Sequence, residues 1–501
     1  MLNNIFTKHF FANIAYALSL LIVFILLLVF VKGDYGNGYV QADSNDKLGQ
    51  AFESSISKGR YALILSVVEY SRLDLPKQLA DFGSPDVARS SNGYVSIFPP
   101  AAALVSAPVY WLGTAFNIGQ LSTYAFMSFV TFINCLLIIY VTSRLKINRW
   151  IGLFSSIAFV FATASLPYSY LITQHQLTAM IALLLIGLLL EKPSTTKHIL
   201  FWLLYGFSAL LDIPNVILLL PFVIYLVFTE LIVIKDNRLS FSADIHCVRM
   251  LAALTVIVPV VLYLSYNFLS SGNILSVGQF LPRYTIGDSS RFTSVVLNQV
   301  PTLPFDITQL HRGLVILLFG FERSILFFSP FVYLSLLGLP RLYTQNKRLT
   351  QTLIGAILAN IFIYATFSDV WGGYSFGSRY LIFTYALSSI CIASAIARFS
   401  KSFIFNSLML IGFTVGVTIH VLGALTTTLI PPVHEAIGLR TDPTIQYAID
   451  VLGRNHLESF AYKNIFSTVD STTFYMALCG IILSLSYAVY LVAVNVHNEE
   501  N

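Results

Sequence analysis

The stretch FANIAYALSLLIVFILLLVFV, residues 11–31, runs for 21 residues without a charged side chain. A helix that crosses a bilayer needs about 20 predominantly apolar residues, so this stretch predicts a membrane span. Similar runs recur as far as Asn495, and 56% of the 501 residues are hydrophobic while only 11% are charged. An ordinary soluble domain has roughly 25% charged residues. The composition therefore excludes a water-soluble enzyme and predicts an all-α polytopic membrane protein.

Charge and cysteine content exclude further classes. The net charge of +5 comes from dispersed residues and does not indicate nucleic-acid binding. Cys135, Cys247, Cys391 and Cys479 lie in or beside apolar runs without a CxxC pair or a histidine cluster, which disfavours disulfides and zinc. We expect no metal site and no cofactor, although metal dependence stays open. The first apolar run is longer than a signal-peptide core and lacks a small-residue cleavage site, so we expect it to be retained.

Runs of about 17 to 25 apolar residues give about twelve predicted spans. They are 9–31, 122–142, 150–167, 175–190, 199–212, 214–234, 250–270, 314–340, 351–367, 380–397, 404–424 and 473–494. A further stretch, 97–117, decides the topology of everything after it. If it crossed, the short basic loops would lie opposite Lys8, whereas basic loops favour the cytoplasm. Its Pro99-Pro100 start and Pro108 fit a juxtamembrane or re-entrant segment.

This topology predicts that both termini are cytoplasmic and that every long loop is outside. The long loops are 32–121, 271–313, 368–379 and 425–472. We expect residues 1–424, with outer loop 32–121, to form a transmembrane catalytic module, and residues 425–501 to add an outer loop and the last span. The expected location is the plasma membrane, the inner membrane in a bacterium, with the active site facing outside.

Histidines and charged residues within the membrane envelope are costly unless paired or hydrated, so each is a candidate for function. His175 opens a predicted span, and Glu322-Arg323 interrupts an apolar run. Each has a structural alternative, since His175 can be an interfacial histidine and Glu322-Arg323 can mark the outer edge of a short span. Asp212 precedes Ile213-Pro214 and is interpreted as a helix-ending turn, because proline disfavours helix in the residue before it.

The loop from Trp371 to Tyr380 points more strongly to a ligand. Its three glycines allow a close approach of the backbone to a ligand. Trp371, Tyr374 and Tyr380 offer flat surfaces suited to a sugar or an isoprenoid chain, and Arg379 carries a guanidinium whose fork matches phosphate. The structural alternative is an interfacial aromatic belt around a tight turn.

The order of these features resembles the GT-C class of polytopic glycosyltransferases, which includes protein O-mannosyltransferases and the lipid A aminoarabinose transferase. The likeness covers roughly residues 10–400. It rests on Gly59-Arg60-Tyr61-Ala62-Leu63, Asn92-Gly93-Tyr94 leading into Ser96-Ile97-Phe98-Pro99-Pro100, Ala107-Pro108-Val109-Tyr110, His175, Arg323 with Ser329-Pro330, and Trp371-Gly372-Gly373 with Phe376-Gly377-Ser378-Arg379-Tyr380. The chain departs from the class at Ser57, where related members often have Asp, at Ala101, where Gly is common, and at Ser378, where Pro is common.

The resemblance implies a hexosyl- or pentosyltransferase that moves a sugar from a polyprenyl phosphate to an acceptor hydroxyl outside the membrane. Such chemistry needs a carboxylate base and a cation for the leaving phosphate. We expect the base to be Asp34, then Asp46 or Asp81, with Asp86 and Asp369 next. The expected phosphate ligands are Arg379 and Arg323, followed by Arg60 and His175. Trp371, Tyr374 and Tyr380 are expected to contact sugar or lipid.

Two other kinds of function compete with this interpretation. A transporter or lipid flippase would explain the spans, but would favour a charge at the membrane midplane and repeated halves. A lipid-linked polysaccharide ligase or polymerase would also act on the outer face, and only the residue-level likeness separates it from the first interpretation. The expected partners are a lipid-linked sugar, membrane lipids and a glycan, lipid or protein acceptor.

Overall fold

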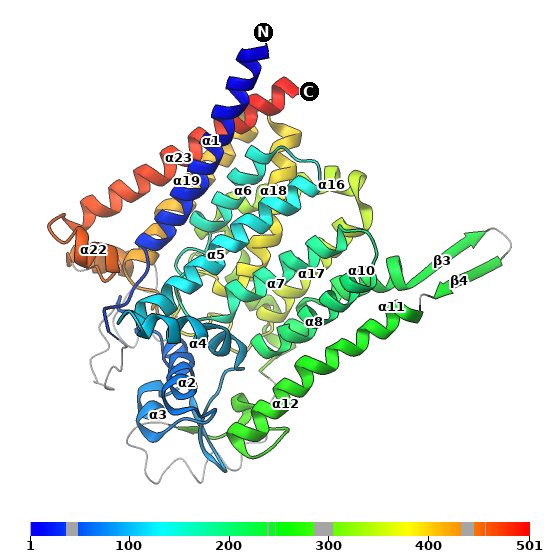
Figure 1. Cartoon of the computed structure of the whole chain (residues 1–501). Coiled ribbons are helices and arrows are strands. Elements are labelled where there is room, and N and C mark those ends of the chain that lie inside the picture. The colour runs from blue at the N-terminus through cyan, green and yellow to red at the C-terminus, as the bar shows by residue number, and fades with distance from the viewer. Residues whose placement is uncertain are drawn as a thin grey trace.

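The computed structural model describes residues 2–36, 49–237, 240–245, 247–284, 304–431, 445–455 and 457–500. It is a bundle of helices with two small sheets (Figure 1). The helices are α1 Leu2–Val29, α2 Ser55–Tyr70, α3 Lys77–Gly83, α4 Ala101–Thr114, α5 Gly119–Arg144, α6 Arg149–Phe161, α7 Gln174–Leu189, α8 Thr195–Leu211, α9 Asn215–Leu218, α10 Leu220–Leu226, α11 Cys247–Leu251, α12 Ile257–Ser271, α14 Leu310–Leu318, α15 Ile325–Phe328, α16 Leu339–Gln345, α17 Lys347–Ala365, α18 Ile382–Phe399, α19 Phe403–Leu425, α21 Ile445–Gly453, α22 Phe460–Ile465 and α23 Ser471–Glu500. The protein is therefore mostly helical, as predicted, and the two small sheets are features that the predicted all-α class did not include.

Seven helices of the described part of the chain are long and apolar enough to cross a membrane. They are Phe10–Val29, Gly119–Arg144, Cys247–Ser271, Lys347–Ala365, Arg379–Phe399, Phe403–Leu425 and Ser471–Asn498. Others are apolar but shorter, such as α6 and α7, because the chain between them turns through residues 162–173 instead of extending either helix. The expected count of about twelve spans therefore stays a prediction.

The stretch 97–117 does not cross the bundle. The N–H of Gly36, beyond the end of α1, donates to the carbonyl of Asn117, before the start of α5, at 2.7 Å. The end of α1 and the start of α5 therefore lie together at one end of the bundle, as the predicted juxtamembrane segment requires. Its helix α4 has 14 residues, or about 21 Å at 1.5 Å per residue, which is too short for a hydrocarbon core of about 30 Å.

The end of the bundle that holds α2, α3 and α4 lies opposite the two chain termini (Figure 1). There β1 (Val87–Ser90) pairs antiparallel with β2 (Gly93–Ser96) and with β5 (Arg283–Tyr284), which follows α12. This small sheet joins two predicted outer loops. The other sheet is the hairpin of β3 (Ile232–Asn237) and β4 (Ser240–Ile245), which projects from the bundle.

A buried ion pair ties three remote segments together at the end that holds α2. Lys32 lies 3.6 Å from Glu53 and donates to the carbonyl of Thr426 at 3.0 Å, and its side chain is fully buried. The Glu53 carboxylate also accepts from the Gly49 N–H (2.6 Å), the Thr427 hydroxyl (2.6 Å), and the N–H and hydroxyl of Thr428 (both 2.9 Å). These bonds fasten the ends of α1 and α19 to the first outer loop.

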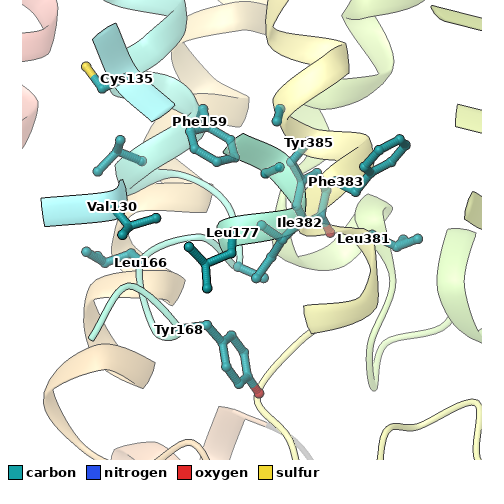
Figure 2. Packing of buried hydrophobic residues seen from close by; sticks show 14 of the residues in the cluster. Val130, Cys135, Phe159, Leu166, Tyr168, Leu177, Leu381, Ile382, Phe383 and Tyr385 are labelled. Carbon is teal, nitrogen blue, oxygen red and sulfur yellow. The ribbon is translucent and has the colours of Figure 1, made fainter. Parts of the chain in front are cut away.

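The core surrounds α18, which is almost wholly buried. Figure 2 shows how α5, α6 and α7 pack against it. Side chains in this packing include Val130, Cys135, Phe159, Leu177, Ile382 and Tyr385. The 3₁₀ helix Pro330–Gly338 reaches α18 at Gly338, where an added Cβ would lie 1.9 Å from the carbonyl oxygen of Cys391. The rigid neighbours of α18 therefore fix the position of Arg379, which lies in the turn Arg379–Leu381 before this helix.

Candidate active site

The loop from Trp371 to Gly377 wraps around Arg379. Gly372, Gly373 and Gly377 have φ values of 74°, 63° and 64°, which side chains other than glycine rarely adopt. A Cβ on Gly372 would lie 3.1 Å from Nε of Arg379. Gly372 therefore lets the backbone pass close to this arginine, while the predicted approach of the loop to a ligand stays a prediction.

Arg379 is a buried cation without an ion pair in the described residues. Its side chain is 7% exposed, and its Nε finds no protein acceptor there. The guanidinium lies 5.4 Å from the ring centre of Tyr380. Tyr380 in turn stacks on Tyr364 of α17, with ring centres 4.2 Å apart and planes 9° apart. The arginine is thus held beside an aromatic pair with donor capacity left unused.

Arg60 of α2 is a second buried cation of the same kind. It is 1% exposed, its guanidinium lies 4.1 Å from the ring centre of Phe98, and Nη2 donates to Oε1 of Gln174 at 2.6 Å. Its Nε and Nη1 have no acceptor among the described residues. Burial lowers the pKa of Arg60 to about 10, an effect that the Arg379 charge increases and that Asp212 and Asp86 oppose. Arg60 therefore stays protonated at neutral pH.

His175 lies between these groups. It is buried at the start of α7, with its ring centre 5.9 Å from that of Tyr380 and 6.5 Å from that of Tyr168. His175, Gln174, Tyr364 and Tyr380 line one small cavity together with Asn360, Asn215, Thr178, Leu218 and Phe383. The cavity measures about 10 Å³, which is room for a single water molecule.

Arg323 has a different environment from Arg60 and Arg379. It is 1% exposed and donates to three backbone carbonyls, those of Trp371 (3.4 Å), Glu322 (2.9 Å) and Ile430 (2.8 Å). It therefore holds the glycine-rich loop against the segment after α19. This geometry favours Arg60 and Arg379 over Arg323 as ligands of a phosphate.

The aromatic residues of the loop differ in environment. Trp371 is buried, donates from Nε1 to Glu322 at 2.8 Å and lies under the guanidinium of Arg312 at 4.6 Å. Tyr374 is 38% exposed. Of the three aromatics predicted to contact sugar or lipid, Tyr380 is the one that lines the small cavity.

The structure does not bring Asp34 or Asp81 to the arginines. Asp34 is exposed and pairs with Lys463 of α22 at 2.6 Å. Asp81 of α3 pairs with Lys77 at 2.8 Å and accepts a hydrogen bond from Tyr284. Burial raises the pKa of Asp81, but these two hydrogen bonds outweigh it and hold the pKa below the usual value. Asp46 lies outside the described residues.

Three other carboxylates lie nearer to the cations. Asp212, at the end of α8, is buried and accepts from Nε2 of Gln174 at 3.0 Å. Asp369 precedes the glycine-rich loop, is half-buried, and its charge acts on Arg323. Its side chain accepts no hydrogen bond within the described residues. Asp86 lies 3.6 Å from Arg283, and its Oδ2 is buried without a partner there.

The fold of this chain is similar to that of solved membrane proteins over nearly its whole length. No family model matches the sequence, and no curated protein matches it. The fold is similar to that of ArnT from Cupriavidus metallidurans in the apo state, at 13% identity over 96% of this chain and 78% of that chain, with a TM-score of 0.48. For ArnT bound to undecaprenyl phosphate the identity is 15%, the coverage 97% and 77%, and the TM-score 0.44.

The oligosaccharyltransferase of Archaeoglobus fulgidus in its apo form is also similar, at 12% identity, with 92% of this chain and 55% of that chain covered and a TM-score of 0.42. This chain thus spans about half the length of the archaeal enzyme.

Proposed function

We propose that the chain is a membrane glycosyltransferase that transfers a sugar from a polyprenyl phosphate to an acceptor hydroxyl. The observation that carries this proposal is the pair of buried guanidinium groups of Arg60 and Arg379. Nε and Nη1 of Arg60 and Nε of Arg379 find no acceptor in the described residues. A buried charge is costly unless it is paired and hydrogen-bonded. Such an arrangement is suited to an anion that arrives with the substrate.

A phosphate is the anion that suits these groups. Guanidinium groups bind phosphate through parallel N–H bonds of fixed geometry. Arg379 precedes α18, one of the seven helices that can span a membrane, so its guanidinium lies near the level of lipid headgroups. A phosphate on a polyprenyl chain could reach this depth while its tail stays in the bilayer. The basic short loops predict that this end of the bundle faces outside.

The transfer step can then be written with the residues of the site. The acceptor oxygen bonds to the anomeric carbon, the bond from that carbon to the phosphate oxygen breaks, and the electron pair leaves with polyprenyl phosphate. Arg60 and Arg379 stabilise the charge that develops on this phosphate. The acceptor proton passes to a carboxylate, for which we favour Asp369, because no hydrogen bond within the described residues occupies its oxygens. Tyr380, stacked on Tyr364, offers a flat surface to the sugar.

The experiment that tests this proposal is incubation of the purified protein with a panel of polyprenyl-phosphate sugars. We expect one donor to release polyprenyl phosphate in step with transfer to an acceptor, and release to fall at least about a hundredfold in Arg60→Met and Arg379→Met. Movement of a lipid across a proteoliposome membrane without cleavage of any donor would support the flippase instead. Turnover of diphosphate-linked oligosaccharides alone would support the ligase or polymerase.

A further inference from the structure

Asp212 is fixed at the end of α8 by its own backbone. Its N–H donates to the carbonyl of Ser208, and its carbonyl accepts from the N–H of Asn215, both at 3.1 Å. The residue is extended, with φ −165° and ψ 132°, as expected before Ile213-Pro214. The interpretation as a helix-ending turn is therefore correct for the backbone. It leaves the buried carboxylate unexplained, because that group is not needed to end a helix.

The carboxylate of Asp212 determines which way the side-chain amide of Gln174 points. An ionised carboxylate only accepts hydrogen bonds, so it takes the NH2 group of Gln174, 3.0 Å away. The carbonyl oxygen of the same amide must then face the opposite way. That oxygen accepts from Nη2 of Arg60 at 2.6 Å. The neutral amide of Gln174 thus lies between the carboxylate of Asp212 and the guanidinium of Arg60.

This arrangement fixes the guanidinium of Arg60 and leaves two of its nitrogen donors without a hydrogen bond. Gln174 takes one N–H of the guanidinium, and the ring of Phe98 covers one of its faces at 4.1 Å. Nε and Nη1 remain without a protein acceptor in the described residues. If Asp212 contacted Arg60 directly, it would form a bidentate ion pair and use the N–H groups that an anion needs. The amide fixes the plane of the guanidinium while leaving those groups unused.

We propose that Asp212 and Gln174 are positioning residues, which orient the Arg60 guanidinium so that its Nε and Nη1 meet the donor phosphate. This inference rests on the proposed function for the identity of the anion, but the chain Asp212–Gln174–Arg60 itself exists in the protein without a ligand. Asp212 therefore takes no proton from the acceptor. We expect loss of its charge to reach the donor phosphate through Gln174 and Arg60.

The first measurement is a double-mutant cycle on the ligand-free protein. Asp212→Asn should lower the melting temperature in the wild-type background, because the buried Arg60 charge loses its compensation. In the Arg60→Met background it should be neutral or stabilising, because a buried carboxylate then has no cation to oppose. Gln174→Met breaks the same chain at its middle and serves if Asp212→Asn does not fold. Asp74→Asn is the matched control, since Asp74 is also a buried carboxylate but pairs with Arg72. Its effect should be the same in both backgrounds.

The second measurement is binding of a polyprenyl phosphate to the same variants. Asp212→Asn should weaken binding about tenfold in the wild-type background, which corresponds to about 1.4 kcal/mol, and less than twofold in Arg60→Met. Asp74→Asn should leave binding unchanged.

The outcomes separate the positioning inference from the proposed function. If Asp212→Asn has equal effects in both backgrounds of the ligand-free cycle, the hydrogen bonds Asp212–Gln174–Arg60 do not couple the two charged groups, and the inference is overturned. If the cycle shows coupling but polyprenyl-phosphate binding is unchanged, the Asp212–Gln174–Arg60 hydrogen bonds are structural, and the proposed positioning role is overturned. If the cycle shows coupling but the wild-type protein binds no polyprenyl phosphate, the proposed function is wrong, while the coupling of Asp212 to Arg60 through Gln174 is confirmed.

Discussion

Replacement of Arg379 by methionine tests whether this cation serves function or stability. Methionine keeps a long unbranched side chain but removes the charge and all N–H groups. Arg379 is 7% exposed, and its Nε has no acceptor in the described residues. An unsatisfied buried group costs about 1–3 kcal/mol, and more when it is charged. We therefore expect Arg379→Met to leave the free energy of unfolding unchanged or to raise it by about 1 kcal/mol.

The same substitution should greatly reduce transfer. Loss of one donor to a developing anion costs about 2.7–4 kcal/mol, or a factor of 10² to 10³ in rate, by analogy with oxyanion holes. The comparison variant is Arg323→Met. It removes three hydrogen bonds to backbone carbonyls, those of Trp371, Glu322 and Ile430, so it should destabilise the protein by about 3 kcal/mol or more.

The assay pairs thermal unfolding in detergent with single-turnover transfer at saturating donor. Arg312→Met is the matched control, because Arg312 is an exposed cation at the same end, stacked on Trp371; its transfer rate should stay within about threefold of wild type. An Arg379→Met protein that keeps more than half of the wild-type rate would refute Arg379 as the phosphate ligand. One that unfolds like Arg323→Met would refute the claim that its donors are unused.

Three further predictions concern the carboxylates and the topology. Glu53→Ala should destabilise the protein by about 3–5 kcal/mol in thermal unfolding, because it leaves Lys32 buried and unpaired; a change below 1 kcal/mol would contradict the role of this pair. Asp369→Asn should lower the single-turnover rate by 10² to 10⁴, whereas Asp34→Asn should be mild, and the reverse order would restore Asp34 as the base. Native Cys247 is exposed and should react with an impermeant thiol reagent only from the cytoplasm. A cysteine that replaces Asp34 should react only from outside. Labelling of both cysteines from the same side would overturn the predicted topology.

The sequence predicted the features that depend on composition and on local conformation. Apolar runs predicted the spanning helices, and the prolines and basic loops placed 97–117 at one end of the bundle. The three glycines were expected to allow a close approach to a ligand; the structure shows that Gly372 lies against Arg379, and the approach to a ligand stays a prediction. These signals need no knowledge of remote contacts, because each depends on the residues of one segment.

The contacts between remote segments could not be predicted. Asp34 follows the first span, as expected, but its partner Lys463 is 429 residues away. Asp212 gave the signal of a helix-ending turn, and its contact with Gln174 depends on how α7 packs on α8. Arg323 and Arg379 are the same residue type in similar apolar surroundings. Only the carbonyls around Arg323 distinguish a structural arginine from one with unused donors.

The central claim, that Arg60 and Arg379 together hold the donor phosphate, is tested most directly by an experimental structure of the protein with a polyprenyl phosphate bound. The account predicts the phosphate within about 3 Å of Nε or Nη1 of Arg60 and of the Arg379 guanidinium, beside His175, with Gln174 still between Arg60 and Asp212. A phosphate bound elsewhere, with both guanidinium groups still unoccupied, would contradict it.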